Sequence, residues 1–209
     1  MFSKRAHYLG ALVVVAVVAG AIAWTVAGTP ETQRREPVQT SVAASIFAET
    51  LKAAETGDSA AEYKLSRMYA QGVGVDPNRK EALNWLERAA KDGDVEAQYE
   101  FGNALREGAG VVQDYQSSVK WLQLAAERGN ADAQYALGQM YRAGLGVEVD
   151  NAKAYTWFNL AAAHDLPGAS VQRDAIMRSL TPSQIVEAQA EARRLNDAAT
   201  ATKQSSMEH

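Results

Sequence analysis

Apolar residues recur along most of the chain at the spacing of amphipathic helices. Ala61, Leu65 and Met68 lie at positions i, i+4 and i+7, which places them on one face of a helix predicted over residues 59–71. A second apolar stripe follows after a glycine-rich segment and predicts a second helix. This second stripe consists of Ala82, Trp85, Leu86, Ala89 and Ala90. The pattern therefore predicts a unit of two helices joined by a turn.

The same pattern returns every 36 residues, three times in succession. Each unit carries a Gly-x-Gly-Val segment between its helices and a tryptophan in its second helix. The glycines are Gly72, Gly74, Gly108, Gly110, Gly144 and Gly146, and the tryptophans are Trp85, Trp121 and Trp157. The first glycine of each pair supplies the positive φ with which helices commonly end, and the second permits a tight turn. The helical spacing of the tryptophans predicts core packing rather than a functional role.

Short polar residues stand where the helices are predicted to begin. Asn78, Asp114 and Asp150 precede the second helices and are predicted N-caps, because their side-chain oxygens accept the free N–H groups of a first turn. Asn78 and Glu81 also have the spacing of a capping box. Asp94 is the equivalent predicted cap of a first helix. The helix-start signals therefore agree with the hydrophobic pattern.

Incomplete units flank the three complete ones. Residues 41–57 match a second helix alone, with Glu49 in place of the tryptophan, as suits an exposed end. Residues 167–196 are predicted to form two capping helices, the second of which begins at Pro182 within a Thr-Pro-x-Gln capping sequence. Solenoids need such atypical ends because nothing stacks on them. The polar residues 197–209 are predicted to be a disordered tail.

The N-terminal region predicts a membrane segment. Residues 8–28 are an uncharged run of 21 residues, which as a helix would cross a hydrocarbon core of about 30 Å. Basic residues within residues 1–7 favour a cytoplasmic N-terminus. The run is either an uncleaved signal-anchor helix or a cleaved secretory signal, because Ala21-Ile22-Ala23 fits a cleavage pattern. Both interpretations place the later domain outside the cytoplasm, after a linker predicted over residues 29–40.

Composition narrows the classes of function. The chain has no cysteine, which excludes a disulfide framework and a thiolate metal site. Its net charge is −4, and residues 41–209 hold 17 Lys and Arg against 23 Asp and Glu, so a broad basic face for nucleic acid is not expected. Abundant alanine and few β-branched residues outside the N-terminus favour helix over strand. The predicted fold class is therefore all-α.

Candidate catalytic chemistry is absent from the sequence pattern. His7, His164 and His209 have neither metal-ligand nor triad spacing. The Gly-x-Gly segments follow a helix rather than a strand, which argues against a phosphate-binding loop. The carboxylates fall mostly at caps and on solvated faces and form no defensible acid–base pair. We therefore predict no catalytic residue, no metal and no cofactor.

The order of these motifs resembles the Sel-one-like repeats, which are relatives of the tetratricopeptide repeat with a longer, glycine-rich turn. The resemblance covers three units, at residues 58–93, 94–129 and 130–166. It implies a right-handed α/α superhelical solenoid and a scaffold or adaptor role in protein–protein interaction, often in the bacterial envelope. One branch of that family is secreted and carries a disulfide in each repeat. The absence of cysteine separates this chain from that branch.

The polar positions of the first helices differ between units, whereas the buried positions repeat. The resemblance implies that first helices line the concave face of the solenoid, so these variable positions are candidates for a partner-binding groove. They are Arg67, Asn103, Gln139, Arg106 and Arg142. Ordinary solvent exposure is the alternative explanation of the same variability.

The leading prediction is a non-catalytic scaffold that is anchored in, or secreted across, the bacterial inner membrane. It would bind a protein or peptide partner and no nucleic acid, with its domain in the periplasm. An envelope enzyme acting on cell-wall material or β-lactams is an alternative, but it would need a catalytic constellation that the sequence lacks. A purely structural, self-assembling element is a further alternative, and the sequence leaves the oligomeric state open.

Overall fold

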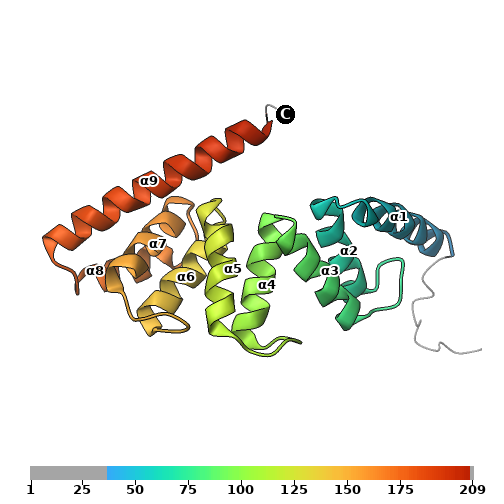
Figure 1. Ribbon diagram of the computed structural model, residues 1–209, viewed down its shortest axis with the longest axis horizontal. Coiled ribbons are helices and arrows are strands. Elements are labelled where there is room, and N and C mark those ends of the chain that lie inside the picture. Colours follow the sequence, from blue (N-terminus) through green and yellow to red (C-terminus); the bar gives the residue numbers. More distant parts are fainter. Residues whose placement is uncertain (1–36, 208–209) are drawn as a thin grey trace, which may run out of the picture. The chain divides into compact units, whose positions relative to one another are not determined.

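The computed structural model describes residues 37–207, and over this range the chain folds into nine α-helices with no strand (Figure 1). This confirms the all-α helical-repeat solenoid for the described residues. The helices are α1 Pro37–Glu55, α2 Ser59–Gln71, α3 Arg79–Lys91, α4 Val95–Glu107, α5 Tyr115–Glu127, α6 Ala131–Ala143, α7 Asn151–Ala163, α8 Ala169–Met177 and α9 Pro182–Met207.

The N-terminal predictions fall mainly outside the described residues. Residues 1–7 and the predicted membrane segment at residues 8–28 both lie outside them. Among residues 37–207, no helix is both long enough and apolar enough to span a membrane. The linker predicted over residues 29–40 is wrong at its end, because α1 already begins at Pro37. Proline is favourable at a first helical position, where its missing N–H would have had no partner.

Helices α2 to α7 form three consecutive pairs, and each of these helices has 13 residues. The two helices of a pair pack against each other, and the second helix of one pair packs against the first helix of the next (Figure 1). Helix α1 packs on α2, and α8 packs on α7. The stack of three pairs is therefore extended at both ends by additional helices.

The first glycine of each turn ends the first helix of its unit as predicted. Gly72, Gly108 and Gly144 adopt left-handed conformations with φ of 70°, 69° and 70°. In each case the glycine N–H donates to a carbonyl in the last turn of the helix, for example that of Met68. A residue with a Cβ would be strained in this conformation, so glycine fixes the point at which the helix stops.

The second glycine of each turn contacts the preceding unit, which the sequence did not predict. A Cβ on Gly74 would collide with the backbone carbonyl of Ala43 in α1, and a Cβ on Gly146 would collide with that of Tyr115 in α5. The equivalent Gly110 lies against side chains of α3. These glycines also have positive φ. They therefore serve both the turn and the close stacking of one unit on another.

The predicted capping box at the start of α3 is only half formed. Asn78 Oδ1 accepts a hydrogen bond from the Glu81 N–H at 3.2 Å, as expected of an N-cap. The Asn78 N–H, however, donates to the Tyr69 carbonyl at 2.9 Å, so it does not need the Glu81 side chain. Asp114 and Asp150 donate to first-helix carbonyls in the same way. This backbone bond closes each turn onto the helix that precedes it.

The predicted disordered tail is wrong for residues 197–207, because α9 continues through them to Met207. The apolar stripe of α9 includes Ala188 and Ala192 and extends to Ala199, which is also buried. Ala199 Cβ lies 3.7 Å from the position that a Cβ of Gly129 would occupy at the end of α5. Helix α9 therefore runs back across α7 and reaches α5. Tertiary packing keeps this polar-looking segment helical.

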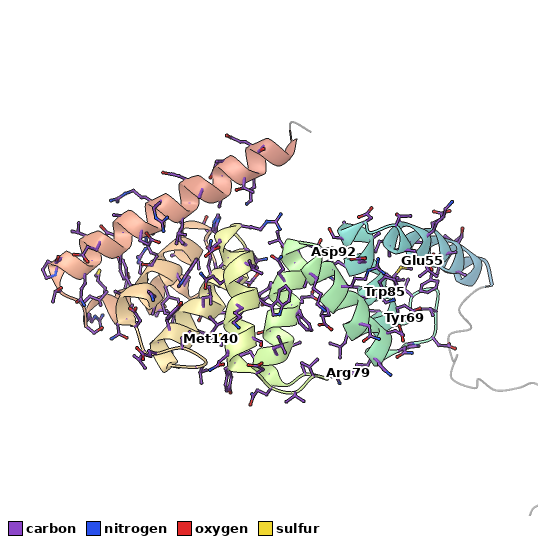
Figure 2. All side chains as sticks on the ribbon, viewed as in Figure 1. Glu55, Tyr69, Arg79, Trp85, Asp92 and Met140 are labelled. Carbon is purple, nitrogen blue, oxygen red and sulfur yellow. The ribbon has the colours of Figure 1, made fainter. Side chains whose placement is uncertain are left out.

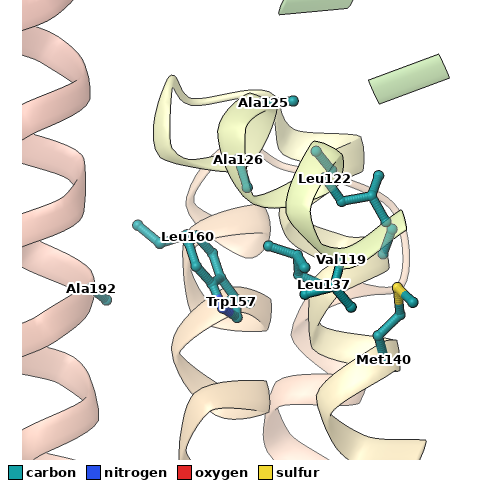
Figure 3. Packing of buried hydrophobic residues seen from close by; sticks show 11 residues of the cluster. Val119, Leu122, Ala125, Ala126, Leu137, Met140, Trp157, Leu160 and Ala192 are labelled. Atoms are coloured by element: carbon teal, nitrogen blue, oxygen red, sulfur yellow. The ribbon is translucent and has the colours of Figure 1, made fainter. Parts of the chain in front are cut away.

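The three tryptophans are not equivalent. Trp157 is 6% exposed and packs in one cluster with Leu160 of α7 and Ala192 of α9 (Figure 3). Trp121 and Trp85 are half-buried. Trp121 meets the ring of Phe101 edge-on, with 5.6 Å between the ring centroids. The prediction of core tryptophans therefore holds fully only for Trp157, which α9 helps to cover.

Candidate functional site

The five residues predicted to bind a partner lie on the first helices of the three units. Arg67 is on α2, Asn103 and Arg106 are on α4, and Gln139 and Arg142 are on α6. Arg67 and Arg142 are exposed, whereas the other three are half-buried. Arg106 Nη1 donates to Gln139 Oε1 at 3.2 Å, so the structure brings these two residues together across neighbouring units.

Polar side chains also join the first helices at the two flanking positions. Tyr63 on α2 donates its hydroxyl to Glu100 Oε1 on α4 at 2.6 Å. The Arg67 guanidinium carbon lies 5.9 Å from the centre of the Tyr63 ring. Arg142 on α6 donates to Gln172 on α8. A ladder of side-chain hydrogen bonds therefore connects α2, α4, α6 and α8.

The environment of Tyr63 shows how tightly the ladder is packed at its first step. Burial, together with the hydrogen bond to Glu100, raises the pKa of Tyr63 to about 12. Arg67 opposes this shift. Tyrosine recurs at this position in all three units, as Tyr63, Tyr99 and Tyr135, but only the first unit pairs it with a carboxylate, so the repeat pattern alone does not reveal the bond to Glu100.

Within residues 37–207, two side-chain atoms of the predicted partner-binding residues, both on α4, are buried without a hydrogen-bond partner. They are Asn103 Oδ1 and Arg106 Nε. A buried polar atom without a partner costs about 1–3 kcal/mol. Both atoms belong to residues of the predicted face. A bound peptide that reorients these side chains would donate a hydrogen bond to Asn103 Oδ1 and accept one from Arg106 Nε.

Shallow hollows border the first unit of this face. One hollow of about 190 Å³ lies between α2, α3 and α4 and is lined by Arg67, Glu100 and Leu86, among others. A second hollow of about 350 Å³ lies between α1 and α2 and is lined by Ile46, Arg67 and Val73, among others. Arg67 therefore stands between two depressions with partly apolar walls.

A buried polar column runs parallel to this face at one position of every first helix. Gln98 Nε2 donates to the Ala90 carbonyl at 3.1 Å. Gln134 Nε2 donates to the Ala126 carbonyl at the same distance. Each amide thus satisfies a carbonyl at the end of the preceding second helix. The sequence reading missed this column, although a polar residue at one buried register in three units is a usable signal.

In the first unit this position is Glu62, which is fully buried and cannot donate. Arg88 replaces the missing donor: its Nη2 donates to the Ala54 carbonyl at 3.3 Å. Arg88 Nε lies 2.5 Å from Glu62 Oε1. Burial raises the pKa of Glu62, Arg88 lowers it, and the nearby Asp92 raises it again. The first unit therefore carries an ion pair where the others carry an amide.

Metal-binding groups were the remaining candidate chemistry among the described residues. Within residues 37–207, no group of three or more His, Asp or Glu side chains could hold a metal ion. His164 is exposed at the C-terminal end of α7.

The chain was compared with family models, with curated proteins and with solved structures. The family model of the Sel1 repeat matches residues 59–94, 95–130 and 131–166. The crystal structure of a Sel1 repeat protein from Oxalobacter formigenes is 36% identical and has a TM-score of 0.59. The match covers 62% of this chain and 97% of that chain. No curated protein was found to match.

A second solved structure is that of c5321, a protective antigen present in uropathogenic Escherichia coli strains that displays an SLR fold. It is 28% identical, with a TM-score of 0.48. The match covers 76% of this chain but only 43% of that one, so this chain spans less than half the length of the antigen.

Proposed function

Because the chain belongs to the Sel1 repeat family, we propose that it is a non-catalytic scaffold that binds a protein or peptide partner along α2, α4 and α6. Sel1 repeats form helical scaffolds that typically serve protein interaction. The observation that carries the proposal is the ladder of hydrogen bonds between these helices, with Arg106 bonded to Gln139 at its centre. Side chains already held in place lose less conformational entropy on binding.

The variable composition of the ladder supports selective binding rather than a generic surface. Its steps use a tyrosine with a carboxylate, an arginine with an amide, and a second arginine with an amide. The unmet atoms of Asn103 and Arg106 lie on the middle helix. A peptide that pairs with both would remove their cost, which a peptide of different geometry would not do.

We further propose that residues 8–28 deliver this scaffold outside the cytoplasm, either as an inner-membrane anchor or as a cleaved signal. The uncharged length of this run supports the proposal. Mass spectrometry of the N-terminal peptide, on protein purified from the native cell envelope, distinguishes the uncleaved anchor from the cleaved signal.

Proximity labelling by the full chain at its native location, followed by mass spectrometry, tests the scaffold function. The test variant carries Arg67→Ala, Asn103→Ala and Arg142→Ala, which leaves the central bond of the ladder intact. The control variant changes two cations and one amide elsewhere, and it carries Lys120→Ala, Gln123→Ala and Arg193→Ala; all three of these side chains are exposed. We expect the test variant alone to lose the labelled partner. Equal labelling by both variants would refute binding at this face.

A further inference from the structure

A hollow of about 380 Å³ lies beside α3, at the turn of the second unit. Its apolar walls include Leu83, Phe101 and Val111, and its rim includes Arg79 and Lys80. Arg79 and Leu83 also line the smaller hollow that reaches Arg67. The two depressions therefore meet at Arg79 and lead toward the first helices.

Among the described residues, the cations on this rim have no carboxylate partner. Within residues 37–207, neither Arg79 nor Lys80 has a carboxylate oxygen within ion-pair distance of its side chain. The nearest acids of the lining are already engaged. Glu87 pairs with Lys91, with 2.8 Å between Oε1 and Nζ. Glu100, in the smaller hollow, accepts the hydrogen bond of the Tyr63 hydroxyl.

Helix stability does not explain these two cations. Arg79 and Lys80 are the first two residues of α3 (Figure 2 shows Arg79 at this end). Positive charge is unfavourable at a helix N-terminus because of the helix dipole. The second unit has Tyr115 and Gln116 at these positions. The fold therefore forms without cations there.

The turn of the second unit shapes the rim around Arg79. A Cβ on Gly110 would lie 2.7 Å from Arg79 Nε and 2.7 Å from Leu83 Cδ1. A Cβ there would displace both side chains, so glycine lets them lie close to the turn. The Arg79 side chain is exposed, and it lies against this turn beside Leu83.

We propose that this hollow binds an acidic segment of a protein partner in which a carboxylate flanks a large apolar side chain. The carboxylate pairs with Arg79, whose planar guanidinium can donate two parallel hydrogen bonds, and with Lys80. The apolar side chain covers Leu83, Phe101 and Val111. This inference rests on the proposed scaffold function and specifies the chemistry of the partner.

Fluorescence anisotropy with the full 209-residue chain in detergent micelles tests the inference. The probe is a labelled peptide that alternates Asp with Leu and Phe. We expect Arg79→Gln with Lys80→Gln to weaken its binding at least about tenfold, because both charged contacts are lost. The control variant, Lys120→Gln with Arg193→Gln, removes the same charge elsewhere and should bind like the parent. Thermal melting checks that both variants stay folded.

Two further peptides separate this mode of binding from simple charge attraction. A peptide with Ser in place of Leu and Phe, and one with Lys in place of Asp, should both bind much more weakly. The inference is overturned if the parent does not bind the acidic apolar peptide, if the Ser peptide binds as tightly, or if the two double variants bind alike. If the variant Arg79→Gln with Lys80→Gln still labels the partner, binding at this hollow is refuted but the proposed scaffold function is not. The absence of any labelled partner overturns the scaffold function itself.

Discussion

Replacing Arg88 with leucine should expose the cost of the buried carboxylate in the first unit. Glu62 has no exposed side-chain area, whereas the Arg88 side chain is 44% exposed. Removing one partner of a buried ion pair typically destabilises a protein by about 3–5 kcal/mol. Because water reaches Arg88, we expect the lower end, about 3 kcal/mol. Leucine is a compatible replacement, since Leu124 stands at the equivalent position of the second unit.

Adding Glu62→Gln to Arg88→Leu should recover most of that loss. The new amide matches Gln98 and Gln134, so it can donate to the Ala54 carbonyl as they donate to theirs. No charge then remains to be buried, and we expect the double variant to lie within about 1 kcal/mol of the parent. The two substitutions should therefore couple by about 2 kcal/mol.

Urea denaturation of the full chain, followed by circular dichroism and tryptophan fluorescence, measures these free energies of unfolding. Lys91→Leu is the control, because it breaks a surface pair on the same helix, with 59% and 44% of the two side chains exposed. This control should cost less than about 1 kcal/mol. The reasoning is refuted if Arg88→Leu costs no more than the control, or if Glu62→Gln does not rescue it.

Three further predictions concern pH, stacking and the ladder. The raised pKa of Glu62 means that the folded state binds a proton at this carboxylate more tightly than the unfolded state does. The free energy of unfolding of the parent, relative to that of Glu62→Gln, should therefore rise as the pH falls toward the ordinary pKa of 4.5. Denaturation at successive pH values measures this difference. Gly146→Ala should cost at least about 2 kcal/mol more than Gly57→Ala in thermal or urea unfolding: both have positive φ, but only Gly146 adjoins another backbone within 4 Å. Equal costs would show that stacking contributes nothing. Tyr63→Phe should cost about 1 kcal/mol, and the absorbance change that it removes from the tyrosine titration should lie near pH 12. A loss near the ordinary value of 10 would contradict the buried, hydrogen-bonded environment of Tyr63.

Local rules sufficed for the regular parts of the fold. The prediction of a helix over residues 59–71 is matched by α2, because Asp58 caps its start and Gly72 ends it, and both signals lie in the sequence itself. The same holds for α9 at Pro182, where Thr181 and Gln184 exchange capping bonds. Capping and turn chemistry act over a few residues, so a single sequence reveals them.

Long-range features were beyond those rules. Ala199 is buried only because α9 turns back over α5, and no local pattern marks that contact. The five candidate residues lie on the first helices, where the repeat pattern places them, but the pairing of Arg106 with Gln139 and of Arg142 with Gln172 depends on distances between units. The sequence pattern does not mark Arg79, because its proposed role depends on which carboxylates lie near it in the folded chain.

The path of α9 changes how the stack should come apart. In a linear array each unit normally holds only its immediate neighbours, so either end can fray independently. Helix α9 contacts both α7 and α5, and it thereby fastens the third unit to the second across α6. Among the described residues, the end at α1 contacts α2 but has no such fastening helix. We therefore expect the C-terminal units to open together as one block. We expect opening to begin at the N-terminal unit, so that its amide hydrogens exchange first.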